Sequence, residues 1–543
     1  MDRSLEHFDV LIVGAGLSGI GAGYHLQDKC PTKSYAILEA RERSGGTWDL
    51  FRYPGIRSDS DMHTLGYAFR PWDNPKAIAD GGSILTYIRS TADDYGIAEK
   101  IRFNHRVRGA SWSSAKARWE IEAERTDTGE TVRLTCDFLL CCCGYYRYDH
   151  GFTPHFEGLE RFGGRIVHPQ HWSDDIDYEN RRVIVIGSGA TAVTLVPALA
   201  EKAAHVTMLQ RSPSYVVSLP AEDELANRLR RKLPAKLAYG IVRWKNVLLM
   251  LLSFRLSRRR PELMKKLIRK GLERALPPSY DIDTHFTPRY NPWDQRMCLV
   301  PDGDLFEALS NGRASMVTDR IDAFTETGVS LASGTKLEAD LIVTATGLDL
   351  VPLGGMAVTV DGREVSIAET LAYRGMMLSG IPNLAVAFGY TNASWTLKCD
   401  LTCEYVCRLL RHMDAHGYSF CIPENHDPFL APEPFIDFSS GYVVRAIHKF
   451  PRQGPKPPWR LHQNYARDIV SLRLSRLEDG VLQFRRIPAH VAEPSSILPP
   501  TPTPTPTPHS ALEHDGAAAR DDGRGDVASL DVVGTADAQP DPR

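Results

Sequence analysis

A chain of 543 residues is too long for one hydrophobic core, so we expect two or three domains. With 43% hydrophobic and 24% charged residues the composition is typical of a soluble globular protein, and a net charge of −3 excludes a general attraction to nucleic acid. No uninterrupted apolar stretch reaches the ~18 residues of a transmembrane helix, and the first predicted strand starts too early to leave room for a secretory leader. The ten cysteines lack the spacing of a disulfide framework, which indicates a reducing, cytoplasmic location.

A glycine-rich turn at residues 14–19 (GAGLSG) lies between an apolar run at 8–13 and a helical pattern at 17–27. The run is typical of a buried parallel strand. A helix that starts at such a turn points its free N–H groups at a pyrophosphate. The segment therefore predicts the first turn of a dinucleotide-binding domain.

The residues of this turn and of the next strand indicate which dinucleotide it takes. Gly14 permits the tight bend, Gly16 lets the backbone approach phosphate, and Gly19 lets the helix pack on the strand. The apolar run at 35–38 ends at Glu39, where an acid hydrogen-bonds ribose hydroxyls. Because an acid repels a 2′-phosphate, we expect FAD or NAD here rather than NADP.

Two segments rich in glycine, aromatic and charged residues follow in chain order. Residues 45–59 (GGTWDLFRYPGIRSD) read as a loop shaped by Gly and Pro that presents Trp, Arg and Asp near a flavin. Residues 162–172 (FGGRIVHPQHW) read as a linker whose aromatic residues and His168 couple two domains. For His168 we favour a linker role in domain movement over catalysis.

A second glycine-rich turn at 187–192 (GSGATA) follows the apolar run 182–186 and opens a helical pattern at 190–201. The next strand, 205–209, ends at Gln210 and Arg211 instead of an acid. A positive charge beside hydrogen-bonding groups is what a 2′-phosphate requires, so this turn favours NADP. An ordinary surface arginine is the alternative interpretation of Arg211.

Two late strands, at 136–143 and 339–346, each ending at a glycine, would close the two nucleotide folds. We therefore predict an α/β protein with two Rossmann-like dinucleotide-binding domains, for FAD and NADP, a helical insertion and a disordered C-terminal tail. The expected segments are residues 1–160 and 348–494 for the FAD domain, 161–220 and 291–347 for the NADP domain, 221–290 for the insertion, and 495–543 for the Pro/Thr-rich tail.

The insertion is strongly basic. Residues 228–274 hold sixteen Lys and Arg against two Glu, and an apolar run at 247–252 lies between basic flanks. Two interpretations fit this pattern. The helix lies on an anionic membrane surface, or it packs its apolar run against the protein and leaves its arginines in water. We favour the second alternative, with peripheral association with the cell membrane left open.

Cysteines at positions 399, 403 and 407 would form one stripe on a helix. Zinc needs a fourth ligand and usually closer cysteine pairs, so we interpret the stripe as small packing residues and expect no metal site.

Residues 45–59 and 162–172 together resemble the motifs of the type I Baeyer–Villiger monooxygenases, within the class B flavoprotein monooxygenases. Both segments stand at that family's places relative to the glycine turns, although Ser173 replaces the Pro or Asp that follows the family's tryptophan. The resemblance covers residues 8 to 490. Segments 52–61, 291–296 and 389–398 are closest to a mycobacterial member of the family.

The resemblance implies roles for individual residues. Arg296 would be the active-site arginine above the flavin, and Asp59 the carboxylate that orients it. The implied contacts with FAD and NADP are made by Gly14, Gly16, Ser18, Gly19, Glu39, Thr47, Trp48, Asp49, Leu50, Arg57, Ser58, Asp59, Val107, Gly187, Ser188, Gly189, Ala190, Thr191, Ala192, Val193, Gln210 and Arg211.

The implied activity is an FAD-containing, NADPH-dependent oxygenation of a hydrophobic ketone by O₂ through a C4a-peroxyflavin, giving an ester or lactone. Sulfides and thioamides would be further substrates, and Tyr390, Asn392, Trp395 and the apolar insertion would line the substrate pocket. The main alternative is an N- or S-oxygenating flavin monooxygenase without ketone activity. A disulfide reductase would need a close pair of redox cysteines beside the flavin, and no such pair follows the first glycine turn. A non-enzymatic NADPH sensor would bind the nucleotide without consuming oxygen.

Overall fold

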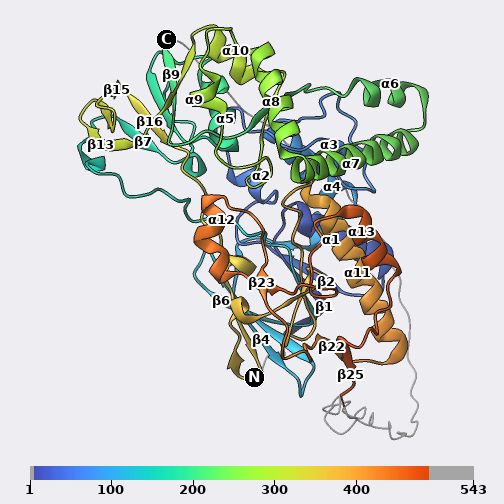
Figure 1. The fold of residues 1–543 in the computed structure, drawn as a ribbon. Helices are drawn as coiled ribbons and strands as arrows, with labels where there is room; N and C mark the ends of the chain where they lie inside the picture. Colours follow the sequence, from blue (N-terminus) through green and yellow to red (C-terminus); the bar gives the residue numbers. More distant parts are fainter. Residues whose placement is uncertain (1–4, 488–543) are drawn as a thin grey trace, which may run out of the picture. The chain divides into compact units, whose positions relative to one another are not determined.

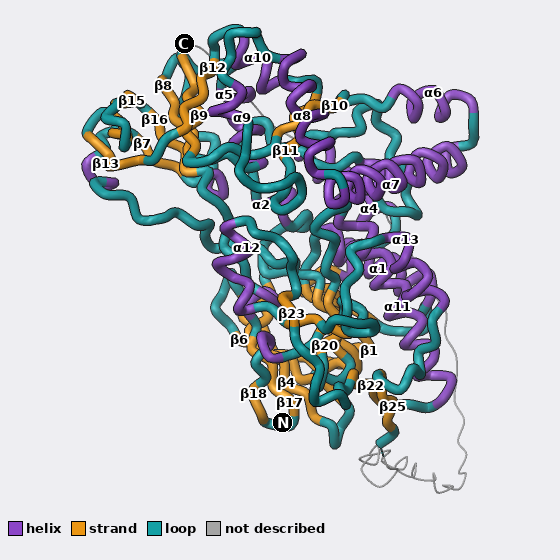
Figure 2. Tube along the Cα trace, viewed as in Figure 1, coloured by secondary structure: helices purple, strands orange, loops and turns teal. Residues whose placement is uncertain are grey.

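The computed structural model describes residues 5–487, so the tail expected at 495–543 lies outside the described residues. Two sheets dominate the described chain (Figures 1 and 2). The larger has nine strands in the order β18-β17-β4-β5-β6-β1-β2-β3, with β21 paired to β6. Their bounds are β1 Glu6–Val13, β2 Tyr35–Leu38, β3 Ile101–Arg102, β4 His105–Ser113, β5 Arg118–Arg125, β6 Thr131–Cys141, β17 Ala357–Val360, β18 Arg363–Glu364 and β21 Leu384–Val386.

The parallel centre of this sheet brings distant parts of the chain to one edge. β1 pairs in parallel with β2 and β6, and β21 pairs in parallel with β6. The carboxyl ends of these four strands therefore lie together, and ligands of open α/β sheets bind at that edge.

Helices cover one face of this sheet. Val10 and Ile12 of β1 share a buried cluster with α1 (Leu17–Lys29), α4 (Gly81–Asp94) and α11 (Trp395–His416). α1 and α11 lie side by side in Figure 1 and pack closely. Leu11 and Val13 point to the other face because side chains alternate along a strand, and there they join a cluster with the outer strands β4 and β5.

The second sheet has five strands, all parallel, in the order β12-β9-β8-β16-β7. Their bounds are β7 Arg165–Val167, β8 Arg182–Ile186, β9 His205–Gln210, β12 Ala314–Thr318 and β16 Leu341–Thr344. Helices α5 (Ala190–Leu199) and α10 (Asp304–Ser310) pack on one face. A small antiparallel sheet of β13 (Ile321–Thr325), β14 (Gly328–Leu331) and β15 (Lys336–Glu338) covers the other (Figure 2).

The stretch at 221–290 is helical, with α6 Glu224–Lys232, α7 Ala235–Arg259, α8 Pro261–Ala275 and α9 Ile282–Phe286. The other helices are α2 Thr47–Leu50, α3 Met62–Leu65, α12 Gly441–Ala446 and α13 Tyr465–Ile469. The other strands are β10 Val216–Leu219, β11 Cys298–Pro301, β19 Ala372–Tyr373, β20 Met377–Leu378, β22 Phe420–Pro423, β23 Glu433–Pro434, β24 Arg452–Gln453 and β25 Leu482–Arg485.

The predicted α/β fold with Rossmann-like dinucleotide-binding architecture is confirmed, and the differences are local. β6 starts at Thr131, earlier than expected, because its first half pairs in antiparallel with β5. The expected linker at 162–172 contains a strand, β7, which pairs with β16 at the edge of the second sheet. The cysteines at 399, 403 and 407 are buried on α11, as packing residues should be.

The expectation that no segment is long enough to span a membrane was wrong. α7 has 25 residues and is mostly apolar, so by length and composition alone it qualifies as a candidate span. The sequence criterion failed because Arg243 and Lys245 interrupt the apolar run, whereas the helix continues through them.

Close packing at Gly19 gives the first prediction. A Cβ atom there would lie 1.8 Å from the carbonyl oxygen of Gly14, whereas a Cβ at Gly271 on α8 would meet nothing within 4 Å. We expect Gly19→Ala to destabilise the protein by about 1–3 kcal/mol or more through this overlap. Gly271→Ala, the matched control, should stabilise it by about 0.5–1 kcal/mol because alanine favours a helix.

Thermal unfolding of the two variants measures the difference. Equal melting temperatures for Gly19→Ala and the unmodified chain would show that α1 does not approach the turn as closely as described.

Candidate functional site

Both glycine turns open onto one cavity of about 1500 Å³, which we call the central cavity. Its wall includes Gly14, Gly16 and Ser18 of the first turn and residues 187–191 of the second. Pockets for a single small ligand are typically ~300–1,000 Å³. The central cavity therefore has room for two nucleotide-sized ligands.

The helix ends at the two turns suit anionic ligands. Gly16 and Gly189 are the N-cap residues of α1 and α5, and neither helix has a side-chain cap to hold its first N–H groups. A Cβ at Gly189 would meet nothing within 4 Å, whereas a Cβ at Gly16 would lie 3.3 Å from the α-carbon of Gly46, so the two glycines let their segments approach at the cavity wall. Uncapped N–H groups facing open space bind phosphate well.

Glu39 stands at the end of β2 and lines the central cavity. Its carboxylate accepts hydrogen bonds from the backbone N–H groups of Ala15 (2.8 Å) and Arg41 (3.0 Å). Burial raises the pKa of this carboxyl, and the two N–H donors oppose that rise. A carboxylate has about four acceptor positions, so Glu39 keeps capacity for a ribose hydroxyl.

Arg296 and Asp59 form an ion pair at the cavity wall. The Nη2 atom of Arg296 lies 2.8 Å from the Asp59 carboxylate, and each side chain is about one-third exposed, toward the cavity. The negative charge of Asp59 is the main cause that raises the pKa of Arg296, so the guanidinium stays protonated. The Asp59 carboxylate thus fixes the positively charged guanidinium of Arg296 in the same cavity as the two turns.

A neighbouring ion pair ties the same loop to the second sheet. Arg57 donates to both carboxylate oxygens of Asp304, the first residue of α10. Ser58 lies between Arg57 and Asp59 and donates from its hydroxyl to the carbonyl of Ser60 at 2.7 Å. These contacts hold residues 57–59 in one conformation at the cavity wall.

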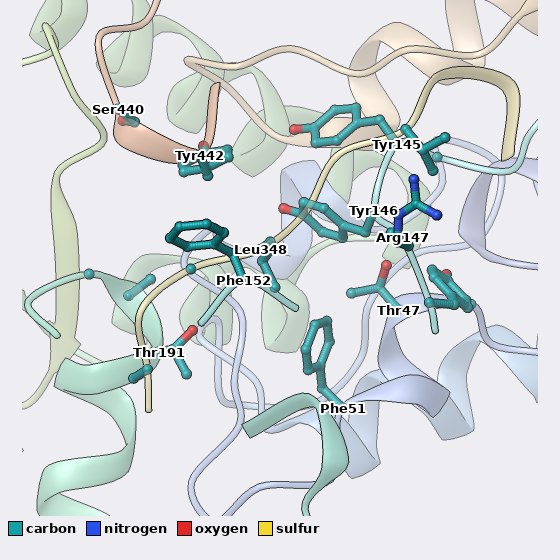
Figure 3. Close-up of a pocket in the computed structure, with 18 of the residues that line it drawn as sticks. Thr47, Phe51, Tyr145, Tyr146, Arg147, Phe152, Thr191, Leu348, Ser440 and Tyr442 are labelled. Carbon is teal, nitrogen blue, oxygen red and sulfur yellow. The ribbon is translucent and has the colours of Figure 1, made fainter. Parts of the chain in front are cut away.

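Aromatic side chains line the cavity around Arg296. Figure 3 shows the rings of Tyr145 and Tyr146 directed toward the side where Tyr442 and Phe152 lie. Burial raises the pKa of both Tyr145 and Tyr146, so their hydroxyls stay neutral. The wall near Arg296 therefore combines guanidinium groups with neutral aromatic rings, and the guanidinium of Arg445 stacks on the ring of Phe152.

Arg211 follows β9 and lines the cavity, and among the described residues no carboxylate forms an ion pair with it. Arg320 also lines the wall near Arg211. It comes from the turn after β12, whose Thr318 pairs with Gln210 of β9. Sequence reasoning missed Arg320 because it follows a strand with no glycine motif.

Most residues expected to bind cofactor line the central cavity. These are Gly14, Gly16, Ser18, Glu39, Thr47, Trp48, Arg57, Ser58, Asp59, Val107, Gly187, Ser188, Gly189, Ala190, Thr191 and Arg211, together with Arg296. Tyr390 and Trp395 line it too, whereas Asn392 does not and instead donates to the carbonyl of Gln463.

Six expected residues lie off the cavity wall: Gly19, Asp49, Leu50, Ala192, Val193 and Gln210. Ala192 and Val193 are fully buried in the core of the second sheet. Gln210 is 2% exposed and donates to the His285 carbonyl (2.8 Å) and the Thr318 hydroxyl (2.9 Å), so its side chain points away from the cavity. Residues 221–290 contribute no wall residue either, contrary to the expected role of the insertion in a substrate pocket.

Asp49 holds the loop together. Its carboxylate is buried and lies 2.8 Å from Arg41, 2.5 Å from Arg52 and 2.8 Å from Arg89. These three arginines come from separate segments, and each is partly exposed. Asp49 therefore has a structural role in this loop, and its expected cofactor contact stays a prediction.

His168 also lies off the cavity wall. Its Nε2 atom is 3.1 Å from the carbonyl of Gly347, and its Nδ1 atom accepts from the backbone N–H of Gln170. Burial lowers the pKa of this imidazole. The contact joins residues 162–172 to the turn that follows β16, a position that suits a linker.

Comparisons with known proteins identify the family to which the chain is similar. Residues 67–352 match the model of the flavin-binding monooxygenase-like family, and residues 12–76 match an NAD(P)-binding Rossmann-like domain. The chain is 55% identical over 487 residues to the FAD-containing monooxygenase EthA of Mycobacterium tuberculosis, covering 90% of this chain and 99% of that protein. It is 52% identical over 484 residues to the putative FAD-containing monooxygenase MymA of the same species, covering 88% and 98%.

Among solved structures, an oxidized steroid monooxygenase bound to NADP superposes with a TM-score of 0.64 at 23% identity, over 77% of this chain and 88% of that one. An open crystal structure of cyclohexanone monooxygenase gives a TM-score of 0.63 at 19% identity, over 77% and 90%. At this identity the likeness establishes the fold.

The arginine cluster around Asp49 gives the second prediction. Asp49→Ala leaves three guanidinium groups without their shared carboxylate, which we expect to cost about 2–3 kcal/mol. That is less than the ~3–5 kcal/mol of a fully buried pair because the arginines are partly in solvent. Denaturant unfolding of Asp49→Ala and of Asp127→Ala, which removes an exposed partner of Arg125, measures the contrast. Equal losses in the two variants would contradict a structural role for Asp49.

Proposed function

Because the chain belongs to the flavin-binding monooxygenase-like family, we propose that it is an FAD- and NADPH-dependent Baeyer–Villiger monooxygenase. The proposed reaction converts a ketone, O₂, NADPH and a proton into an ester or lactone, NADP⁺ and water. One oxygen atom enters the bond beside the carbonyl, and the other leaves as water. The observation that carries the proposal is the Arg296–Asp59 pair in a cavity that both glycine turns share.

The first turn is the proposed site for FAD. The relative EthA is an FAD-containing monooxygenase, and this chain covers nearly all of it. The uncapped start of α1 would receive the pyrophosphate, and Glu39 a ribose hydroxyl. The loop at 45–59 supplies Thr47 and Trp48 to the same wall.

The second turn is the proposed site for NADPH. The uncapped start of α5 would receive its pyrophosphate. Arg211 and Arg320 follow paired ends of neighbouring strands, where two guanidinium groups suit a 2′-phosphate. We propose that these two charges give the enzyme its preference for NADPH over NADH.

When bound, FAD supplies the oxidation and reduction: it accepts hydride from NADPH and activates O₂. Arg296 then acts through its fixed charge, which lowers the free energy of negative charge on the oxygen that attacks the carbonyl. Asp59 limits the rotamers of Arg296 and keeps it protonated. The aromatic rings of Tyr146, Tyr442 and Phe152 exclude water and suit a hydrophobic ketone, sulfide or thioamide.

The third prediction concerns Arg296. We expect Arg296→Ala to keep FAD binding and NADPH-dependent flavin reduction, because both turns stay intact. Ketone oxygenation should fall by roughly 10²–10³, the loss typical of one preorganised charge contact. Product analysis with a simple methyl ketone, a tertiary amine and a methyl sulfide, for the unmodified enzyme and the variant, measures it.

Ester formation by Arg296→Ala at the unmodified rate would refute the role of this residue. Oxidation of the amine or sulfide by the unmodified enzyme with no ester from any ketone would instead support an N- or S-oxygenating enzyme.

The fourth prediction concerns Arg211. Arg211→Ala removes one charge-assisted contact with the 2′-phosphate, worth about 1.5–3 kcal/mol, so the ratio of kcat/KM for NADPH to that for NADH should fall roughly 10- to 100-fold. The kcat/KM for NADH should stay unchanged, because NADH has no 2′-phosphate for Arg211 to contact. Arg313→Ala, which removes an arginine that pairs with Glu307 away from the cavity, is the matched control. An unchanged ratio in Arg211→Ala would place the 2′-phosphate elsewhere.

A further inference from the structure

One side of α7 carries a row of exposed apolar side chains. Five of them follow one another at intervals of three or four residues, which places them along one face of the helix. They are Leu237 (53% exposed), Ile241 (44%), Trp244 (44%), Leu248 (59%) and Leu252 (63%), and we call them the apolar row. Single exposed apolar residues need no explanation, but a continuous row of this kind marks an interaction surface.

The opposite side of α7 is anchored to the molecule. Tyr239, Arg243 and Val247 are buried there. The Nη1 atom of Arg243 donates at 2.8 Å to the carbonyls of His63 and Gly66, at the two ends of α3. A helix held by a buried guanidinium cannot move into a bilayer as a span, so its apolar row can contact lipid only along the surface.

Basic side chains extend the apolar row. At 3.6 residues per turn, Arg255 and Arg259 continue the same face beyond Leu252, and both are exposed. At the other end, Lys236 in the first turn of α7 and Lys232, the last residue of α6, are exposed. None of these four forms an ion pair with another described residue. Their charges are therefore available to an external anionic surface.

This charge pattern distinguishes between two occupants of the face. A second copy of the chain, packed through the same row about a two-fold axis, would bring basic helix ends together, and like charges across an interface are unfavourable. An anionic lipid surface offers phosphate groups to the basic ends and an apolar boundary to the leucines.

We propose that α7 docks the protein on an anionic phospholipid membrane, lying along the surface with the apolar row in the headgroup boundary and the basic ends on lipid phosphates. The docking face is separate from the central cavity, since residues 221–290 contribute nothing to the cavity wall. The proposal therefore stands independently of the reaction proposed above.

Flotation of the full-length protein, loaded with FAD, tests the docking. The probes are vesicles of phosphatidylcholine and phosphatidylglycerol in equal parts, and vesicles of phosphatidylcholine alone. We expect the protein to float with the anionic vesicles, to bind the neutral ones at least about tenfold more weakly, and to detach as salt screens the charges. No binding to anionic vesicles, or equal binding to both, would overturn the proposal.

Variants of the row locate the contact. Replacing Leu248 and Leu252 of the row, together with the exposed Leu249 next to them (56% exposed), with Ser should weaken vesicle binding about tenfold or more and leave NADPH oxidation unchanged. The matched control replaces Phe429 (91% exposed) and Leu474 (76% exposed), which lie off α7, with Ser and should bind like the unmodified protein. Equal losses in both variants would overturn the assignment to α7.

Sedimentation without lipid tests whether a second copy of the chain, rather than a membrane, covers the apolar row. A dimer that the serine variant of α7 dissociates, in a protein that binds no vesicle, would show that a second copy covers the row and would overturn the proposal. A species whose sedimentation is the same for the unmodified protein and this variant supports lipid as the occupant.

Discussion

The ion pair between Asp59 and Arg296 is the contact on which the site depends. Asp59 belongs to the loop after β2, at the edge of the nine-stranded sheet, and Arg296 comes from the segment that leads into β11. These segments are far apart in sequence, and the pair brings them together at the wall of a cavity that both glycine turns share. Without it, Arg296 would have no carboxylate partner among the described residues to fix the direction of its guanidinium.

α7 supports both segments that carry this pair. Asn246 donates to the carboxylate of Asp61 at 2.8 Å, two residues beyond Asp59. Arg258 pairs with Asp294 at 2.7 Å, two residues before Arg296. The insertion contributes no residue to the cavity wall. Through these two contacts it nevertheless holds the segments that carry Asp59 and Arg296 in position. The exposed face of α7 takes no part in these contacts.

Sequence reasoning located the parts of the site that depend on local order. The turns at Gly14 and Gly187, the acid Glu39 and the cation Arg211 each follow a strand at a fixed spacing, and strand ends of a parallel sheet meet at one edge. The sequence could not show whether a side chain next to a motif points into the cavity or into the core. Gln210 is adjacent to Arg211, but alternation along the strand turns it into the core, and Asp49 faces three arginines that only the tertiary fold assembles. Tyr442 reaches the wall from α12, and no spacing in the sequence connects that helix with the glycine turns.

A crystal structure of the protein grown with FAD and NADP⁺ tests this arrangement most directly. We predict two nucleotides bound together, with the FAD pyrophosphate at the start of α1, the NADP⁺ pyrophosphate at the start of α5, and the Arg296 guanidinium in contact with the flavin ring. A single nucleotide that occupies both turns, or a flavin out of reach of Arg296, would contradict it.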